Sequence, residues 1–170
     1  IDAFESLKKE GLIRQYGISS IRPNVIERFL EKGTPISIMM QYSMLDRRPE
    51  EWFPMIHNAA ASVLTRGTLA KGLLTMEGLS RAKSSNGFAN YGSDELVQTI
   101  TSLSEGTEDL HAAAIAYVLR EQTIASALVG AGSVEQLLDS VIAYEKGCMN
   151  EEMDQLNNIV QIHQYTERRP

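Results

Sequence analysis

The sequence predicts an α/β fold built on a parallel sheet. Short apolar runs alternate along the chain with stretches in which apolar residues recur every three or four positions, which are the patterns of strands and helices. The strand patterns at residues 36–41 and 124–129 are apolar almost throughout, as expected of parallel strands buried on both faces. No internal repeat and no domain boundary stands out, so a single domain is expected.

The first third of the chain contains three helix patterns and three strand patterns. An amphipathic helix is expected at 2–10, ending at Gly11, and a second begins at Pro23 and ends at Gly33. Pro49 begins a third helix, because acidic residues follow it at the positive end of the helix dipole. The strands are expected at residues 12–18, 36–41 and 62–65.

The rest of the chain opens with an expected insertion at about 76–106. Residues 76–92 are rich in Ser, Gly and Asn and predict a long loop, followed by a helix at 93–104. Thr107 is expected to cap the next helix, and the fourth strand follows at 124–129. Ser133 and Gln136 form a capping-box pattern, and a final helix is expected at 150–164. The helix after Ser133 carries an apolar stripe made of Val134, Leu137, Leu138, Val141 and Ile142.

Four parallel strands are compatible with a small open sheet or with half of a (β/α)8 barrel. An open sheet would expose its first and last strands as edges, and no charge protects the segment IASALV. A complete barrel has no edges and takes about 250 residues, so half of one matches this length and order. The pattern alone leaves both architectures open.

Composition excludes several partners. The net charge of −6 argues against a nucleic acid or an anionic membrane surface, and there is no apolar run of about 18 residues to span a membrane. The single cysteine, Cys148, excludes an intrachain disulfide and favours a cytoplasmic location. The chain starts within a helix pattern and without Met, so we expect a piece of a longer protein.

Two glycine loops are candidate phosphate sites. The stretch TRGTLAKGLLT lacks the P-loop order because Lys71 precedes Gly72, and it lacks the Gly-x-Gly-x-x-Gly spacing. It is either an ordinary loop or a site where backbone N–H groups at 67–69 bind phosphate, with Lys71 or Arg66 adding charge. The second loop, 130–132, leads into the helix capped by Ser133. Both loops follow consecutive strands, where barrel enzymes often bind phosphate.

Other polar residues carry weaker signals. The three histidines, His57, His111 and His163, lie far apart in helix patterns, so no metal site is expected. Gln41 ends an otherwise apolar strand and is either a satisfied core group or a ligand contact at the carboxyl end of a barrel strand.

Four ordered segments resemble the aldo-keto reductase superfamily, and most closely its bacterial members: LKKEGLIRQYGISSIRP, MMQYSMLDRRPEEWFP, SVLTRGTLAKGLLT and LVGAGSVEQLLDSVIAYE. The resemblance implies a (β/α)8 barrel of which residues 1–170 form the C-terminal half, with parallel strands 5–8, their helices and a C-terminal helix. It also implies hydride transfer between NADP(H) and an aldehyde or ketone. The complete enzyme would act on a small-molecule carbonyl substrate.

The resemblance implies a role for each matching position. Ser19, Ser20 and Gln41 would hold the nicotinamide carboxamide, and Arg66 takes the place of an aromatic residue that stacks on the nicotinamide ring. Backbone groups of the first loop would bind the pyrophosphate, and the second loop would approach the 2′-phosphate and adenine. The loop positions are Gly67, Thr68, Leu69, Lys71 and Gly72 for the first, and Gly130, Ala131, Gly132, Gln136, Asp139 and Ser140 for the second. Gly130 and Gln136 replace basic residues common in the family, which leaves the choice between NADP and NAD open.

No catalytic residue is assigned to this chain. The family's catalytic Asp, Tyr, Lys and His lie on the first half of the barrel, so the chain alone is expected to be inactive. We expect it to associate with a missing N-terminal half-barrel or with another copy of itself. Two alternatives stay open: a non-catalytic module that senses nucleotide or serves in assembly, and a stand-alone domain whose loops bind nothing.

Overall fold

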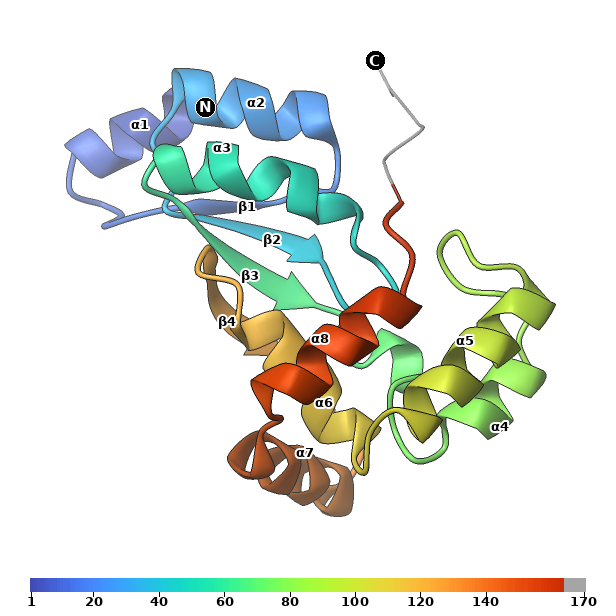
Figure 1. Ribbon diagram of the computed structural model, residues 1–170. Helices are drawn as coiled ribbons and strands as arrows, with labels where there is room; N and C mark the ends of the chain where they lie inside the picture. The colour runs from blue at the N-terminus through green and yellow to red at the C-terminus, as the bar shows by residue number, and fades with distance from the viewer. Residues whose placement is uncertain (164–170) are drawn as a thin grey trace.

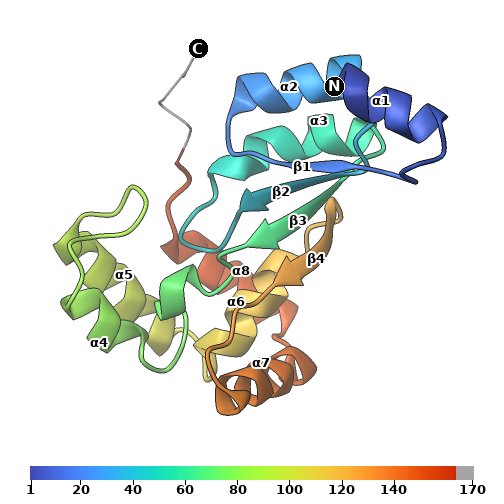
Figure 2. The ribbon, with the colours of Figure 1, turned by 180° about the vertical axis from the view of Figure 1, so that it is seen from behind.

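The computed structural model describes residues 1–163, which form one parallel sheet and the helices packed along it (Figures 1 and 2). The sheet has the order β1-β2-β3-β4, and every neighbouring pair is parallel. The elements are α1 (Asp2–Lys9), β1 (Gly17–Ser19), α2 (Pro23–Lys32), β2 (Ser37–Gln41), η1 (Arg48–Trp52), α3 (Phe53–Asn58), β3 (Ser62–Arg66), η2 (Ala70–Gly72), α4 (Gly78–Lys83), α5 (Ser93–Glu105), α6 (Leu110–Leu119), β4 (Ile124–Leu128), α7 (Val134–Lys146) and α8 (Asn150–Ile159). The α/β prediction is confirmed.

One face of the sheet carries the core. Ile38, Met40 and Val63 are fully buried, and they pack with Ile56 of α3 and Tyr117 of α6. Burial of one such aliphatic side chain contributes roughly 1.5–3 kcal/mol to folding, so this layer dominates the stability of the domain. Side chains alternate between the two faces of a strand, and the residues between the core positions are accordingly less buried.

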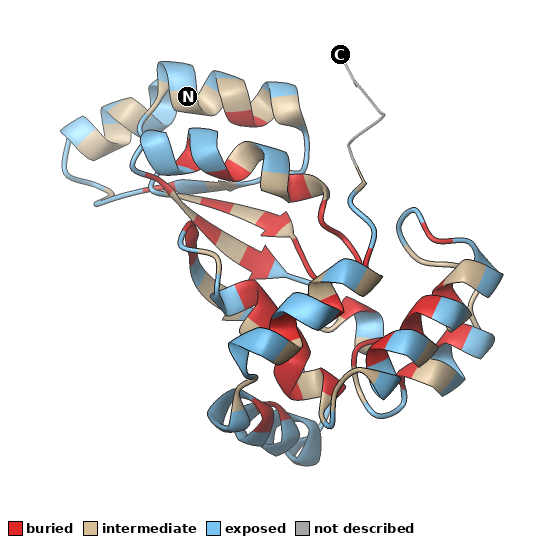
Figure 3. Cartoon of the chain, in the orientation of Figure 1, coloured by how far each residue is buried: buried red, intermediate tan, exposed pale blue. Residues whose placement is uncertain are grey.

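The expectation that the second and fourth strands are buried on both faces is wrong. In β2 the burial alternates between buried and intermediate residues, and β4 is mostly intermediate or exposed (Figure 3). Among the described residues, the helices and their apolar side chains cover the face that carries Ile38 and Val63. The second face of the sheet is therefore left partly open by the described residues, as expected of strands whose other face is covered inside a closed barrel.

Several boundaries also differ from the prediction. The first strand starts at Gly17 rather than at residue 12, because the Tyr16 hydroxyl donates to Glu5 Oε1 (2.5 Å) and accepts from Thr34 N (2.7 Å). These bonds hold the segment against α1 instead of against a strand. The helix after Pro49 starts as the 3-10 turn η1 before continuing as α3, and α8 ends at Ile159. Gln164, the predicted last residue of that helix, lies outside the described residues.

The predicted long loop at 76–92 contains a helix, α4. Its residues Leu79 and Ala82 pack into the core beside α5, and this tertiary contact stabilises a helix too short to show a periodic pattern. The predicted cap at Thr107 is wrong by two positions. Asp109 Oδ1 accepts from Ala112 N (3.0 Å), which makes Asp109 the N-cap of α6, while Thr107 accepts from the backbone of Asp109.

Helix α7 is the most exposed helix of the second half (Figure 3). Only Ser140 and Ala143 on it are buried. All five residues of the predicted apolar stripe are exposed: Val134, Leu137, Leu138, Val141 and Ile142. An exposed apolar face of this kind is typical of surfaces that contact another protein or a membrane.

Candidate functional site

The carboxyl edge of the sheet gathers most of the predicted binding residues. The parallel pairing brings the ends of the four strands to one edge, and these ends are Ser19, Gln41, Arg66 and Leu128. The two glycine loops, 67–72 and 130–132, directly follow the ends of β3 and β4. In α/β proteins ligands bind at this edge, because loops rather than strands determine the chemistry there.

Gln41 and Arg66 are paired across neighbouring strands. They occupy matching positions of β2 and β3, and Arg66 Nη1 donates to Gln41 Oε1 at 3.1 Å. Arg66 also lines a pocket of about 390 Å³ at the end of β1. The pocket contains Ser19, Ser20 and Arg22, so hydroxyl and guanidinium groups surround it.

The loop after β3 has an unusual backbone. Gly67 and Gly72 have positive φ angles of 75° and 84°, and Ala70 and Lys71 share this left-handed conformation with φ of 47° and 60°. Each non-glycine residue in this region costs roughly 1–3 kcal/mol, and such strain is concentrated at functional sites. In the described part of the chain, the N–H groups of residues 67–69 donate to no protein acceptor. Unpaired N–H groups of a turn are able to bind an anion.

Gly67 has a second constraint. A methyl group on its Cα would lie 3.2 Å from Gln41 Cγ, which is closer than ordinary van der Waals contact. Glycine at this position therefore lets the loop approach the side chain of Gln41 while it adopts a positive φ angle.

The loop after β4 ends in a capped helix. Ser133 Oγ accepts from Gln136 N at 3.3 Å, which confirms Ser133 as the N-cap. The Gln136 side chain folds back and its Oε1 accepts from Gly132 N at 2.8 Å. The predicted capping box is therefore present with one difference. The Gln136 side chain accepts from the N–H of Gly132, one residue before the N-cap, and not from the N–H of Ser133. No basic residue lies between 129 and 136.

Asp139 and Ser140 lie farther along α7, and the structure separates them. Asp139 is exposed, whereas Ser140 is buried against α6, with its Oγ donating to Gln136 O (2.9 Å) and lying 3.3 Å from His111 Nε2. Burial lowers the pKa of His111 below its ordinary value, although Asp109 and Asp139 oppose that effect. The Ser140 hydroxyl thus joins α6 to α7.

A buried acid, Asp46, was not among the predicted site residues. Its side chain is fully buried in the loop after β2 and accepts from Gln41 Nε2 at 2.9 Å. Arg48 donates to both of its carboxylate oxygens, from Nε and from Nη2, at 2.7 Å each. The signal for it was an acidic residue followed by two arginines shortly after an apolar strand, because a buried carboxylate requires a cation or hydrogen-bond donors.

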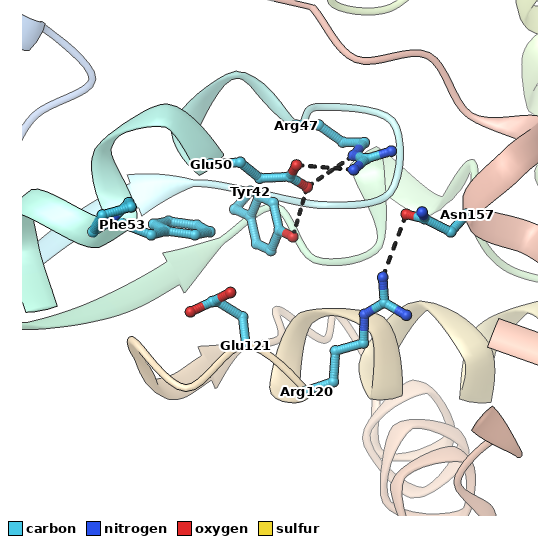
Figure 4. A pocket seen from close by; sticks show the side chains of 8 residues that line it. Tyr42, Arg47, Glu50, Phe53, Arg120, Glu121 and Asn157 are labelled. Atoms are coloured by element: carbon cyan, nitrogen blue, oxygen red, sulfur yellow. Dashed lines mark hydrogen bonds and ion pairs between the residues drawn. The ribbon is translucent and has the colours of Figure 1, made fainter. Parts of the chain in front are cut away.

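A second pocket, of about 430 Å³, lies on the helix side of the sheet (Figure 4). Glu50 is its central polar residue: the carboxylate accepts from Arg47 Nε and Nη2 (2.8 and 2.9 Å) and from the hydroxyls of Tyr42 and Tyr117 (3.0 and 2.9 Å). Burial, together with the charge of Glu50, raises the pKa of both tyrosines well above the ordinary value. These hydroxyls stay protonated and bonded to Glu50, so the cluster stabilises the fold.

The remaining reactive side chains form no site. Burial, with Glu152 nearby, raises the pKa of Cys148 to about 11, so its thiol stays protonated and unreactive. No group of three or more potential metal ligands exists among residues 1–163. Within the same part of the chain, no helix is long and apolar enough to cross a membrane.

Comparisons with known proteins agree with the architecture. A family model described as the aldo/keto reductase family matches residues 1–161. The uncharacterized oxidoreductase YqkF of Bacillus subtilis (strain 168) is 44% identical over 157 residues, which cover 89% of this chain and 51% of that protein. The NADH-specific methylglyoxal reductase of Escherichia coli (strain K12) is 26% identical over 158 residues, which cover 84% of this chain and 47% of that protein. The chain spans about half the length of these curated relatives.

Solved structures give the same relationship. The aldo-keto reductase AKR11C1 from Bacillus halodurans, in its apo form, superimposes with a TM-score of 0.88 at 43% identity. Its holo form superimposes with a TM-score of 0.87 at 42% identity. All of this chain is covered in both comparisons, against 59% and 58% of the two solved chains.

Proposed function

The chain belongs to the aldo/keto reductase family, and from this membership we propose that residues 1–170 are the cofactor-binding, C-terminal half of an NADP(H)-dependent carbonyl reductase. The observation that carries the proposal is the convergence of strand ends and glycine loops at one edge of the sheet. The full barrel would interconvert aldehydes or ketones and alcohols in the cytoplasm. When bound, the cofactor supplies or accepts the hydride.

The residues of the carboxyl edge fit parts of a dinucleotide. The N–H groups of residues 67–69 have no protein acceptor in the described structure and would bind the pyrophosphate, with Lys71 and Gly72 beside them. The N-terminus of α7, reached through Gly130, Ala131 and Gly132, would take the adenosine end.

The side chains at the ends of β1, β2 and β3 suit the nicotinamide end of the cofactor. Ser19, Ser20 and Gln41 offer hydroxyl and amide groups for the carboxamide, and the planar guanidinium of Arg66 is able to stack on a ring. Gln136 and Asp139 would lie near the 2′-phosphate and adenine. The Ser140 hydroxyl is bonded to Gln136 O and lies beside His111 of α6, so Ser140 would hold α7 in place and would not bind the cofactor directly.

Cofactor titration tests this proposal, with two glycine variants as matched probes. We expect purified protein to bind NADPH with a change in nicotinamide fluorescence. Gly67→Ala should weaken binding about tenfold, because the added methyl group strains a positive-φ residue and displaces Gln41. Gly92→Ala is the control, since a methyl group there has open space and the φ angle is −69°.

A parallel titration with NADH decides the cofactor preference. The absence of a basic residue between 129 and 136 leaves the 2′-phosphate without a charged partner in that loop. Tighter binding of NADPH supports the proposal as stated, and tighter binding of NADH corrects it to an NAD(H)-dependent enzyme. Failure to bind either nucleotide overturns it.

The proposal also requires a partner for the open edges. In a right-handed crossover, the helix that links two parallel strands packs over both of them. Helix α1 is therefore expected to pack over β1 and a strand that precedes α1 in the chain, and α7 over β4 and the next strand of the barrel. If a second copy of this chain completed the barrel, β4 of one copy would lie beside β1 of the other. Both α7 of the first copy and α1 of the second would then have to pack over these two strands, where there is room for one helix. An N-terminal half-barrel that begins and ends with a strand avoids this conflict.

Charge on the exposed face of α7 is expected to block that association. The double variant Leu137→Glu, Val141→Glu places two charges where the half-barrel would pack, and it should abolish co-sedimentation with an N-terminal half. Glu105→Gln, an exposed change at the end of α5, should not affect it. Unchanged association of the double variant, or a homodimer formed through this face, would contradict the proposed partner.

A further inference from the structure

We infer that Asp46 and Arg48 are positioning residues that hold the Gln41 amide in a single orientation toward the cofactor. The inference rests on the function proposed above, since it concerns the residue expected to meet the nicotinamide carboxamide. It assigns a role to the ion pair between the buried Asp46 and the partly exposed Arg48, which is separate from the cluster around Glu50.

The chemistry of its neighbours determines the orientation of the Gln41 amide. Asp46 accepts hydrogen bonds, so the group that faces it at 2.9 Å must be the NH₂ end, Nε2. Arg66 only donates, so the group that faces it at 3.1 Å must be Oε1. A flipped amide would place two donors together at Arg66 and two acceptors together at Asp46, and both contacts would be repulsive.

Arg48 keeps Asp46 available for this role. The Asp46 side chain is fully buried, and a buried carboxylate needs hydrogen-bond donors or a cation beside it. The paired donors of Arg48 bind both carboxylate oxygens at 2.7 Å, which supplies that cation and fixes the plane of the carboxylate. A side chain at position 67 would press on Gln41 Cγ at 3.2 Å, so the glycine there leaves the bonded Gln41 side chain undisturbed.

The fixed amide has a definite chemical consequence. With one Nε2 hydrogen bound to Asp46 and one Oε1 lone pair bound to Arg66, Gln41 retains one donor and one acceptor. A primary carboxamide presents the complementary acceptor and donor. The network therefore prepares Gln41 to select the carboxamide of nicotinamide and to set the orientation of its ring.

The test removes the ion pair and compares two ligands. The double variant Asp46→Leu, Arg48→Met replaces the pair with apolar side chains of similar size, a change that buried ion pairs often tolerate. We expect purified protein with the full 170-residue chain to lose about tenfold in NADPH affinity, as expected when a hydrogen-bonded contact is lost. Affinity for 2′,5′-ADP, which lacks the nicotinamide, should remain unchanged.

A matched control removes the neighbouring ion pair instead. Arg47→Met, Glu50→Gln eliminates the ion pair drawn in Figure 4 but keeps an acceptor for the two tyrosines and does not change Gln41. It should lower stability without changing the ratio of the two affinities. If the Asp46 double variant fails to fold, Asp46→Asn is measured instead. Both oxygens of Asp46 accept hydrogen bonds, so either orientation of the asparagine amide places its NH₂ group against a donor of Arg48 or Gln41 and weakens the network. We expect about a threefold loss for NADPH alone.

The outcomes separate this inference from the proposed function. Loss of NADPH affinity alone supports the positioning role. Equal loss for both ligands, or no loss for either, overturns the role while the proposed function stands. If the unmodified protein binds neither ligand, the proposed function itself has failed, and the positioning role fails with it.

Discussion

The isolated 170-residue chain is expected to bind NADPH and yet to turn over no aldehyde. Carbonyl reduction needs a group that protonates the developing alkoxide, and the family resemblance places that tyrosine, with its Lys, His and Asp, on the other half of the barrel. No rate above the uncatalysed background is expected when NADPH consumption is followed with an aldehyde at high protein purity.

The described tyrosines support this expectation. Tyr42 and Tyr117 lie on the helix side of the sheet and donate to Glu50, and burial raises their pKa values further from neutrality. Tyr16 donates to Glu5, and Tyr91 is buried and accepts from the backbone of residue 161. Tyr144 is exposed on α7. Tyr42 follows Gln41 directly at the end of β2, but its hydroxyl is held by Glu50, so it is not free to serve as the proton donor.

Addition of the complementary half is the decisive control. Mixing the chain with an N-terminal half-barrel should restore reduction, since the two parts would then share one site. Steady turnover by the chain alone, free of any second polypeptide, would show that the catalytic groups lie on this half after all.

Glu50→Ala is expected to lower the free energy of unfolding by about 3–5 kcal/mol. The change leaves the Arg47 guanidinium, whose side chain is 8% exposed, without its bidentate carboxylate. It also leaves two buried tyrosine hydroxyls without an acceptor. The same carboxylate helps to keep the pKa of Arg47 above its ordinary value against the opposing effect of burial, so its removal leaves that charge uncompensated.

Urea unfolding measures this loss, with Glu51→Ala as the control. Glu51 is exposed on the same turn and, among residues 1–163, accepts only from the indole of Trp52, so its removal should change stability by less than about 0.5 kcal/mol. A loss below about 1 kcal/mol for Glu50→Ala would mean that solvent replaces the carboxylate and that the cluster does not stabilise the fold. Glu50→Gln should fall between the two, because it keeps an acceptor.

The sequence predicted that the candidate residues lie at one edge of the sheet, because that placement depends on strand order. The runs around Ile38 and Val63 have the strand pattern, and the helices between them require parallel neighbours. The carboxyl ends of the strands then have to meet, which brings Gln41, Arg66 and the glycine loops to one edge. The roles of these residues in cofactor binding remain predictions.

Contacts between distant segments could not be predicted in the same way. The bond between Gln41 and Arg66 joins residues 25 positions apart, and the strained backbone at Ala70 and Lys71 has no sequence signal, because neither residue favours a positive φ angle. Helix α4 has no clear periodicity and forms because Leu79 and Ala82 pack beside α5.

What the sequence determined by itself was local. Pro23, Gly33 and the Ser133 cap mark helix ends through the conformations and hydrogen bonds of adjacent residues, and these were confirmed. Only the tertiary structure decided which apolar faces are covered, because α7 has the same stripe whether or not a neighbour lies against it. It also decided that Asp46 is buried and bonded to Gln41. Whether two side chains come into contact depends on how the chain folds and not on the identity of either residue.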